Sequence, residues 1–235
     1  PETITLISDP KVVQIPIQEN NDPLADIRDF PEILVDTRKS KASNSYFKLR
    51  KSVVTKLLEA KEYLPQSISF LVIEGHRPLS LQKKYFDGYS EELSRLHPNW
   101  DKERIYQEVS KYVAPPEIIP PHSTGGAVDL TLADESGKEI DMGTRLNVSP
   151  KESNNACFTL AANISDSAGA SRQLLINTMS KSGFVNYPTE QNGGTGRTAT
   201  ATWHTTPTTL LLFSVLLNNK MCTTEWRTLK MWSNI

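Results

Sequence analysis

Two short apolar segments limit the folds open to this chain. Ile68 to Ile73 is rich in β-branched and aromatic residues, and Ala127 to Leu132 alternates apolar with polar residues. Both patterns are typical of buried or half-buried strands. Helical segments lie between and around them without a regular βαβ alternation. The sequence therefore predicts an α+β fold, with helices packed on a mainly antiparallel sheet.

The helical segments are recognised by the spacing of their apolar residues. Helices are predicted over Tyr46 to Leu64, which Pro65 stops, and over Ser80 to Leu96, Asp101 to Val113 and Ser165 to Ser182. Gly183 is a suitable C-cap for the last of these. A short strand is expected from Phe184 to Tyr187. Residues 1–43 predict an irregular lead-in with a strand or two.

Length and charge narrow the class of protein. The chain has 235 residues, no internal repeat, and 26 basic against 27 acidic residues. Such a balance predicts neither a nucleic-acid footprint nor an anionic-membrane patch, and no apolar run is long enough to span a bilayer. The two cysteines, Cys157 and Cys222, are expected to be free thiols. The sequence does not predict the oligomeric state.

The sharpest local motif is His122-Ser-Thr-Gly-Gly-Ala-Val-Asp129, placed between a proline-rich loop and a strand. An imidazole nitrogen and a carboxylate oxygen are suitable zinc ligands, and the two glycines allow a tight turn between them. An Asp within an apolar strand needs a partner, because an unpaired buried charge is costly. That partner is either a metal or, with equal weight, a nearby Arg or backbone amides.

A second motif, Glu74-Gly-His-Arg-Pro78, follows the first predicted strand. An Arg at a strand end can bind a carboxylate or stabilise a developing oxyanion over a cleft. The alternative is an ordinary surface Arg before a turn. His76 and His97 are interpreted as satisfied or solvent-facing histidines rather than ligands.

Taken together, these motifs resemble the D-alanyl-D-alanine dipeptidases. The likeness spans roughly residues 25 to 190 and rests on motifs in a fixed order: Arg77-Pro78, His122-x-x-Gly125-x-Ala127-x-Asp129, Asp141-Met142-Gly143-Thr144, and Gly183-Phe-Val-Asn-Tyr-Pro-Thr-Glu190. The resemblance implies the zinc peptidase fold shared with D,D-carboxypeptidases and Hedgehog signalling domains. It also implies zinc as the cofactor and a small dipeptide as the substrate.

Site roles follow from the resemblance position by position. His122 and Asp129 would bind zinc, and Glu190 would be the general base that activates the metal-bound water. Arg77 would stabilise the tetrahedral intermediate. Pro120 and Pro121 stand where some relatives carry a Ser that holds the substrate amino group, so that contact is not implied here.

The likeness breaks directly after Glu190. The family continues Glu-Trp-Trp-His, whose His is the third zinc ligand, whereas this chain continues Gln191-Asn-Gly-Gly-Thr195. Residues 192–204 can be back-translated and read in another frame as Trp-Trp-His-Trp-Ser-Tyr-Gly-Asp-Arg-Tyr-Leu-Ala-Tyr. We hypothesise a frameshift caused by a tandem copy of the bases ACAGA. Residues 1–190 would then form the dipeptidase domain, and residues 191–235 an aberrant tail in place of the family's final strands.

The rival explanation is an insertion, in which His204 of Trp203-His204 becomes the displaced third ligand. The frameshift is preferred because it accounts for the whole Thr- and Gly-rich stretch. No regular element is predicted between Gln191 and Leu210. If the final strands are lost, the Leu210–Leu217 run would expose apolar surface.

The leading prediction for function is zinc-dependent hydrolysis of the D-alanyl-D-alanine dipeptide in peptidoglycan precursor metabolism. A D,D-carboxypeptidase or other peptidoglycan peptidase is the alternative within the same class. A degenerate, non-catalytic binding domain is the alternative from another class, because the third ligand is missing from its place. We expect a cytoplasmic location, or a periplasmic one if a signal peptide has been removed before Pro1.

Overall fold

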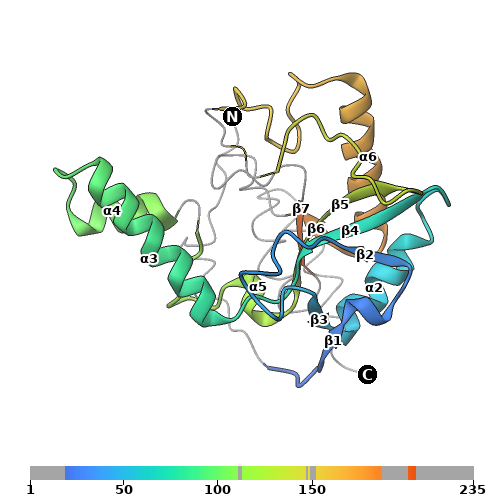
Figure 1. The fold of residues 1–235 in the computed structure, drawn as a ribbon, viewed down its shortest axis with the longest axis horizontal. Coiled ribbons are helices and arrows are strands. Elements are labelled where there is room, and N and C mark those ends of the chain that lie inside the picture. Colours follow the sequence, from blue (N-terminus) through green and yellow to red (C-terminus); the bar gives the residue numbers. More distant parts are fainter. Residues whose placement is uncertain (1–18, 111–112, 147, 149–151, 187–200, 205–235) are drawn as a thin grey trace, which may run out of the picture.

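The computed structural model describes residues 19–110, 113–146, 148, 152–186 and 201–204. Within these ranges the chain forms, in order, β1 (Leu24–Asp26), the 3-10 helix η1 (Ile27–Asp29), β2 (Ile33–Val35), β3 (Lys48–Arg50), α2 (Lys51–Lys61), β4 (Ile68–Glu74), α3 (Leu79–Leu96), α4 (Lys102–Ser110), α5 (Pro121–Thr124), β5 (Ala127–Asp134), α6 (Asp166–Lys181), β6 (Val185–Asn186) and β7 (Ala201–His204). Figure 1 shows their arrangement.

A five-stranded sheet of order β2-β4-β5-β7-β6 forms the centre of the molecule. Only its β2–β4 pair is parallel, and the other three pairings are antiparallel. A separate pair of short strands, β1 and β3, is also antiparallel. The predicted α+β class with a mainly antiparallel sheet is therefore confirmed.

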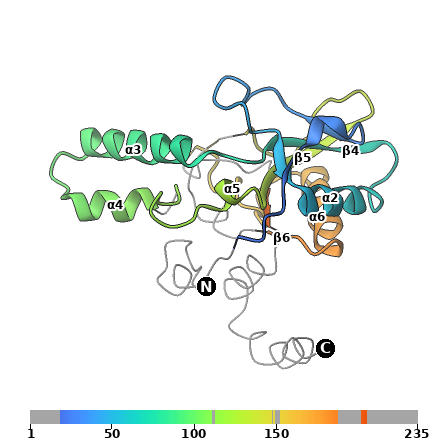
Figure 2. The same cartoon turned by 90° about the horizontal axis from the view of Figure 1, so that it is seen from below.

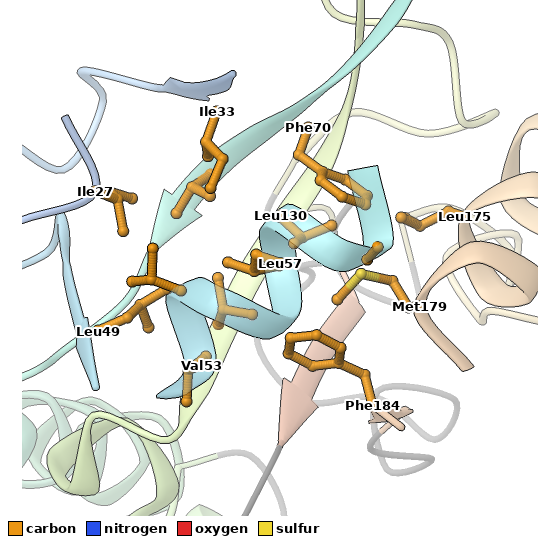
Figure 3. Packing of buried hydrophobic residues seen from close by; sticks show 14 of the residues in the cluster. Ile27, Ile33, Leu49, Val53, Leu57, Phe70, Leu130, Leu175, Met179 and Phe184 are labelled. Carbon is orange, nitrogen blue, oxygen red and sulfur yellow. The ribbon is translucent and has the colours of Figure 1, made fainter. Parts of the chain in front are cut away.

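Helices α2 and α6 cover one face of the sheet, and the main core lies beneath them (Figure 3). Leu57 of α2 and Met179 of α6 meet Phe70 of β4 and Leu130 of β5, and all four side chains are almost fully buried. Burial of each such side chain stabilises the fold by about 1.5–3 kcal/mol. Along β5, Val128, Leu130 and Leu132 belong to this core, so alternation places Asp129 on the opposite face.

Helices α3 and α4 form an arm that projects from the sheet, and they run side by side in both views (Figures 1 and 2). The arm has a small core of its own, made of Phe86, Leu93, Ile105, Val109 and Val113. Asp101 begins α4 by accepting a hydrogen bond from the backbone N–H of Arg104 at 2.8 Å. Both predicted helices are thus confirmed, and α4 is described as far as Ser110, where the described residues break off.

The predicted helix from Tyr46 to Leu64 is wrong at its first turn. Residues Lys48–Arg50 form β3, which pairs with β1, and α2 begins at Lys51. Phe47 and Leu49 are buried as expected, but from an extended backbone. Here pairing with a neighbouring strand outweighs the helical spacing of the apolar residues. The helix over residues 166–181 is confirmed, with Ser165 as its N-cap and Gly183 at a positive φ of 75°.

The expectation of no regular element between Gln191 and Leu210 is also wrong. Residues Ala201–His204 form β7, which lies between β5 and β6 and pairs with both. A segment with little pattern of its own becomes a strand because both of its neighbours offer backbone hydrogen bonds. The division into a domain over residues 1–190 and a tail over residues 191–235 stays a prediction, and β7 belongs to the central sheet.

Two further expectations concern the cysteines and the membrane. Cys157 is a buried free thiol, whereas Cys222 and the Leu210–Leu217 run lie outside the described residues. Among the helices that the structure describes, none combines the length and the apolar character needed to cross a bilayer.

Candidate metal and catalytic site

His122 and Asp129 converge on one point from different elements. His122 lies on the single-turn helix α5, and Asp129 lies near the start of β5. His122 Nε2 is 3.3 Å from Asp129 Oδ1. The two residues are only 7% and 1% exposed, so the carboxylate and the imidazole face each other away from bulk solvent. The pair is confined enough to hold a small cation between an N and an O donor.

A backbone carbonyl sets the orientation of the His122 ring. His122 Nδ1 lies 2.8 Å from the carbonyl oxygen of Gly75. Because a carbonyl only accepts, Nδ1 carries the proton, and the Nε2 lone pair is directed toward Asp129. This is the outer-sphere hydrogen bond that metal-binding histidines commonly make.

The loop after β4 and the α5 turn are joined by reciprocal hydrogen bonds. The backbone N–H of Arg77 donates to the His122 carbonyl at 3.1 Å, and the Ser123 hydroxyl donates to the Arg77 carbonyl at 2.8 Å. Gly125 ends α5 with a positive φ of 74°, a conformation that favours glycine. The Arg50 guanidinium donates to the Thr124 carbonyl at 2.7 Å. These bonds fix the two sequence motifs relative to each other.

Arg77 is buried rather than exposed, so the interpretation as an ordinary surface Arg is wrong. Its side chain makes a two-point ion pair with Glu74, with Nε–Oε1 at 2.7 Å and Nη2–Oε2 at 2.8 Å. Nη1 donates to Gln82 Oε1 at 2.8 Å. Arg77 therefore lies beside His122 with its guanidinium oriented by two neighbours. Its predicted role in stabilising the intermediate stays a prediction.

The other two described histidines are not grouped with these residues as ligands. His97 stacks on Trp100, with ring centroids 3.8 Å apart. His76 is half-buried, and its Nδ1 has no hydrogen-bond partner among the described residues. Burial lowers the pKa of His76, and the positive charge of Arg50 lowers it further. That neither histidine is a ligand stays a prediction, and the buried Nδ1 of His76, unpartnered within the described ranges, does not match the expected satisfied or solvent-facing histidine.

The fit to zinc is good for the first two ligands. His122 and Asp129 supply the donor types that zinc uses, and the hydrogen bond to Gly75 aligns the imidazole. Within the part of the chain that the structure describes, no group of three or more His, Cys, Asp or Glu is close enough to hold a metal. Glu190 lies outside the described residues. His204 is described only by its backbone, as the last residue of β7.

Three residues that contact Arg77 or its partner Glu74 were not predicted from the sequence as site residues. Glu74 appeared only as part of its motif, although an acid and an Arg three positions apart are a recognisable pairing signal. Gln82 and Lys39 had no sequence signal, because their contacts depend on tertiary packing. Lys39 Nζ lies 3.1 Å from Glu74 Oε2.

Comparison with known proteins decides the family. The sequence profile of the D-ala-D-ala dipeptidase family matches residues 37–191. The chain belongs to this family of D-Ala-D-Ala dipeptidases. These enzymes are zinc-dependent hydrolases, so the fold, the enzyme class and the cofactor expected from the sequence are confirmed at the level of the family.

One relative supports this assignment by sequence, and solved structures show a more distant likeness. A D-alanyl-D-alanine dipeptidase from Synechocystis sp. is 30% identical, covering 75% of this chain and 82% of its own. Among solved structures, VanYB in complex with D-alanine-D-alanine has a TM-score of 0.43 at 17% identity, covering 76% of this chain and 84% of its own. The LdcB LD-carboxypeptidase has a TM-score of 0.45 at 16% identity, covering 85% and 76%.

Proposed function

We propose that this protein is a zinc-dependent hydrolase of the D-alanyl-D-alanine dipeptide. The observation that supports this most directly is the convergence of His122 and Asp129, 3.3 Å apart, within a chain of the D-Ala-D-Ala dipeptidase family. The 30% identical relative bears the name of this activity. The proposal places the protein in peptidoglycan precursor metabolism.

The chain's own residues divide the reaction between them. His122 and Asp129 would hold zinc, which supplies a Lewis acid and lowers the pKa of water when bound. Glu190 takes a proton from the attacking water and passes it to the leaving amine as the C–N bond breaks. Arg77 stabilises the negative charge that develops on the carbonyl oxygen.

We further propose that His204 supplies the third protein ligand in the chain as it stands. The register of β7 supports this, because it pairs His204 with Ala127. Ala127 lies two positions before Asp129 on the same strand, and alternation places these two residues on one face of the sheet. The frameshift hypothesis competes with this proposal, since it makes residues after Glu190 a substitute for a lost Trp-Trp-His segment.

Measurements of zinc binding distinguish the proposal that His204 is a ligand from the frameshift hypothesis. We would measure zinc stoichiometry and affinity on the chain, on His204→Ala, and on a version in which Glu190 is followed by Trp-Trp-His. If His204 is a ligand, its removal weakens zinc binding at least tenfold. If the frame has shifted, the restored version binds zinc more tightly. DNA sequencing across the codons for Thr189 to Asn192 tests the frameshift directly, and absence of the duplicated bases would contradict it.

A degenerate binding domain is the second candidate function. It is supported by the sequence after Glu190, where the family's Trp-Trp-His is absent. Release of D-alanine from D-alanyl-D-alanine in the presence of stoichiometric zinc would support the enzyme. If the chain as it stands shows neither bound zinc nor turnover, the degenerate domain is supported.

The D,D-carboxypeptidase alternative is tested in the same assay. A free-dipeptide hydrolase cleaves D-alanyl-D-alanine and leaves longer stem peptides intact. A carboxypeptidase releases the terminal D-alanine from a pentapeptide stem at least as fast. We expect preference for the dipeptide, and a preference for the pentapeptide would reassign the substrate.

A further inference from the structure

The guanidinium of Arg77 is held on two sides by buried side chains that have no assigned role. Glu74 accepts two hydrogen bonds from it, at 2.7 and 2.8 Å, and Gln82 accepts a third at 2.8 Å. An arginine has five N–H donors. Two N–H groups, one on each terminal nitrogen, are therefore not used by these two side chains.

A register shift in the pairing of β4 with β5 places Glu74 next to the candidate metal site. The pairing of β4 with β5 is irregular between Val72 and Glu74, and it resumes with Glu74 opposite Asp129. Directly opposed residues of an antiparallel pair share a face, so the irregularity turns Glu74 to the face of Asp129 and away from the core face of Val72. The anchor for Arg77 and the metal-site carboxylate are thus cross-strand neighbours.

Two opposed buried carboxylates repel each other unless each is compensated. Glu74, which is 1% exposed, is compensated by Arg77 and by Lys39, whose Nζ lies 3.1 Å from Oε2. Asp129 faces His122. A neutral residue in place of Glu74 would leave the Arg77 and Lys39 cations without this shared partner.

Gln82 is fixed from its other end. Its Nε2 donates to the Ala114 carbonyl at 2.8 Å, while its Oε1 accepts from Arg77. Gln82 lies near the start of α3, and Ala114 follows α4, so one amide joins the two ends of the helical arm to the guanidinium. Tyr85, one turn along α3, has its ring 5.2 Å from the guanidinium.

We propose that Glu74 and Gln82 are positioning residues that hold the Arg77 guanidinium in the orientation required for catalysis. The inference rests on the proposed function for its chemical meaning, because Arg77 acts on the developing oxyanion there. The geometry of the three side chains stands independently of it. Neither Glu74 nor Gln82 reacts, and both act through Arg77.

The test follows the Arg77 Nε–H by 15N NMR on the full chain, assigned by its loss in Arg77→Lys. In the wild type this proton is buried between Nε and Glu74, and we expect slow exchange with solvent. Glu74→Gln removes the charged acceptor, and Gln82→Met removes the third bond. We expect exchange to accelerate at least tenfold in Glu74→Gln and less in Gln82→Met. Glu74→Asp, which keeps the charge, should restore part of the protection.

Asp87→Asn is the matched control, because Asp87 lies on α3 in an exposed ion pair with Lys83. It should leave the Arg77 signal unchanged. In the zinc-loaded protein, Glu74→Gln should lower kcat by about 100-fold with a much smaller change in KM, since a misplaced group costs transition-state stabilisation. Unchanged exchange in both variants, or an unchanged kcat, overturns the proposal. If the wild type shows no turnover, the proposed function fails, and the exchange rates still decide whether these residues hold Arg77.

Discussion

The carbonyl oxygen of Gly75 lies 2.8 Å from Nδ1 of His122 and thereby fixes which nitrogen of the ring is available for a metal. Gly75 can occupy this place because it has no side chain. A Cβ there would lie 2.4 Å from the Lys48 carbonyl oxygen and 3.0 Å from Leu49. Backbone on one side and a buried Leu on the other leave little freedom to relax.

Gly75→Ala should therefore lower both stability and zinc affinity. We expect a loss of about 1–3 kcal/mol in the free energy of unfolding, as for other overpacked sites. Displacement of the carbonyl should weaken zinc binding by about 10- to 100-fold. Gly88→Ala on α3 is the control, because a Cβ there meets nothing within 4 Å. An equal zinc affinity in Gly75→Ala and wild type would contradict the orienting role.

Asp129→Asn tests the carboxylate ligand without changing its size. A ligand present at 100 times its dissociation constant stabilises the native state by about 2.7 kcal/mol. We expect zinc to raise the melting temperature of the wild type and to have little effect on Asp129→Asn. Asp134→Asn, near the other end of the same strand, should keep the full response to zinc. A normal zinc response in Asp129→Asn would remove this residue from the ligand set.

Thr202→Pro tests whether β7 completes the sheet. Thr202 pairs with Asp129 in the register of β5 and β7. Proline removes a backbone N–H and is excluded from central strands. We expect a destabilisation of about 1–3 kcal/mol in urea unfolding, because a ladder hydrogen bond is lost, whereas Thr202→Val should be nearly neutral because it keeps strand propensity. If proline is tolerated, residues 201–204 contribute nothing to the folded sheet.

Arg172 of α6 binds three backbone carbonyls of the chain that precedes this helix. Its guanidinium donates to the carbonyls of Met142, Ala156 and Phe158 at 2.7, 2.9 and 2.6 Å. Burial lowers the pKa of Arg172. Arg172→Met leaves these carbonyls without their donor and should cost about 3 kcal/mol. Hydrogen exchange should rise selectively in the segment from 142 to 158, and the exposed Arg95→Met should leave it unchanged.

The ionisation of Asp26 makes the stability of the fold depend on pH. Hydrogen bonds from the Arg28 side chain lower the pKa of Asp26 from its ordinary value of 3.8, against a smaller effect of burial. The unfolded chain therefore binds this proton more readily than the folded one. The contribution to stability is fully present above pH 3.8 and is lost as the pH falls through the lower folded pKa. Asp26→Asn should be less stable than wild type near neutrality, and the difference should shrink on acidification.

The strands at the site could be predicted because their signals are local. Ile68–Ile73 and Ala127–Leu132 carry strand patterns that packing reinforces, and His122 and Asp129 flank a glycine turn whose geometry allows few alternatives. The helical start at Tyr46 failed because β3 exists only through its pairing with β1. A pattern read from one segment does not contain the partner that decides its conformation.

The environment of Arg77 shows a second limit. The motif around Arg77 predicted a functional Arg. The register shift that turns Glu74 toward the face of Asp129, however, depends on the pairing of two strands far apart in sequence. Gln82 and Lys39 reach the same cluster from α3 and from the loop after β2. Contacts between residues far apart in sequence produce no periodic pattern from which they could be predicted. Strand β7 was missed for the same reason.

The position of β7 has a consequence during synthesis of the protein. Strands β5 and β6 are synthesised before residues 201–204, and β7 is the strand that pairs with both of them. Until β7 has been synthesised, the edge of β5 next to Asp129 offers unpaired N–H and C=O groups to any other extended chain. Early termination of translation would make this exposure permanent. Such fragments should be substrates for chaperones and proteases rather than smaller versions of the enzyme.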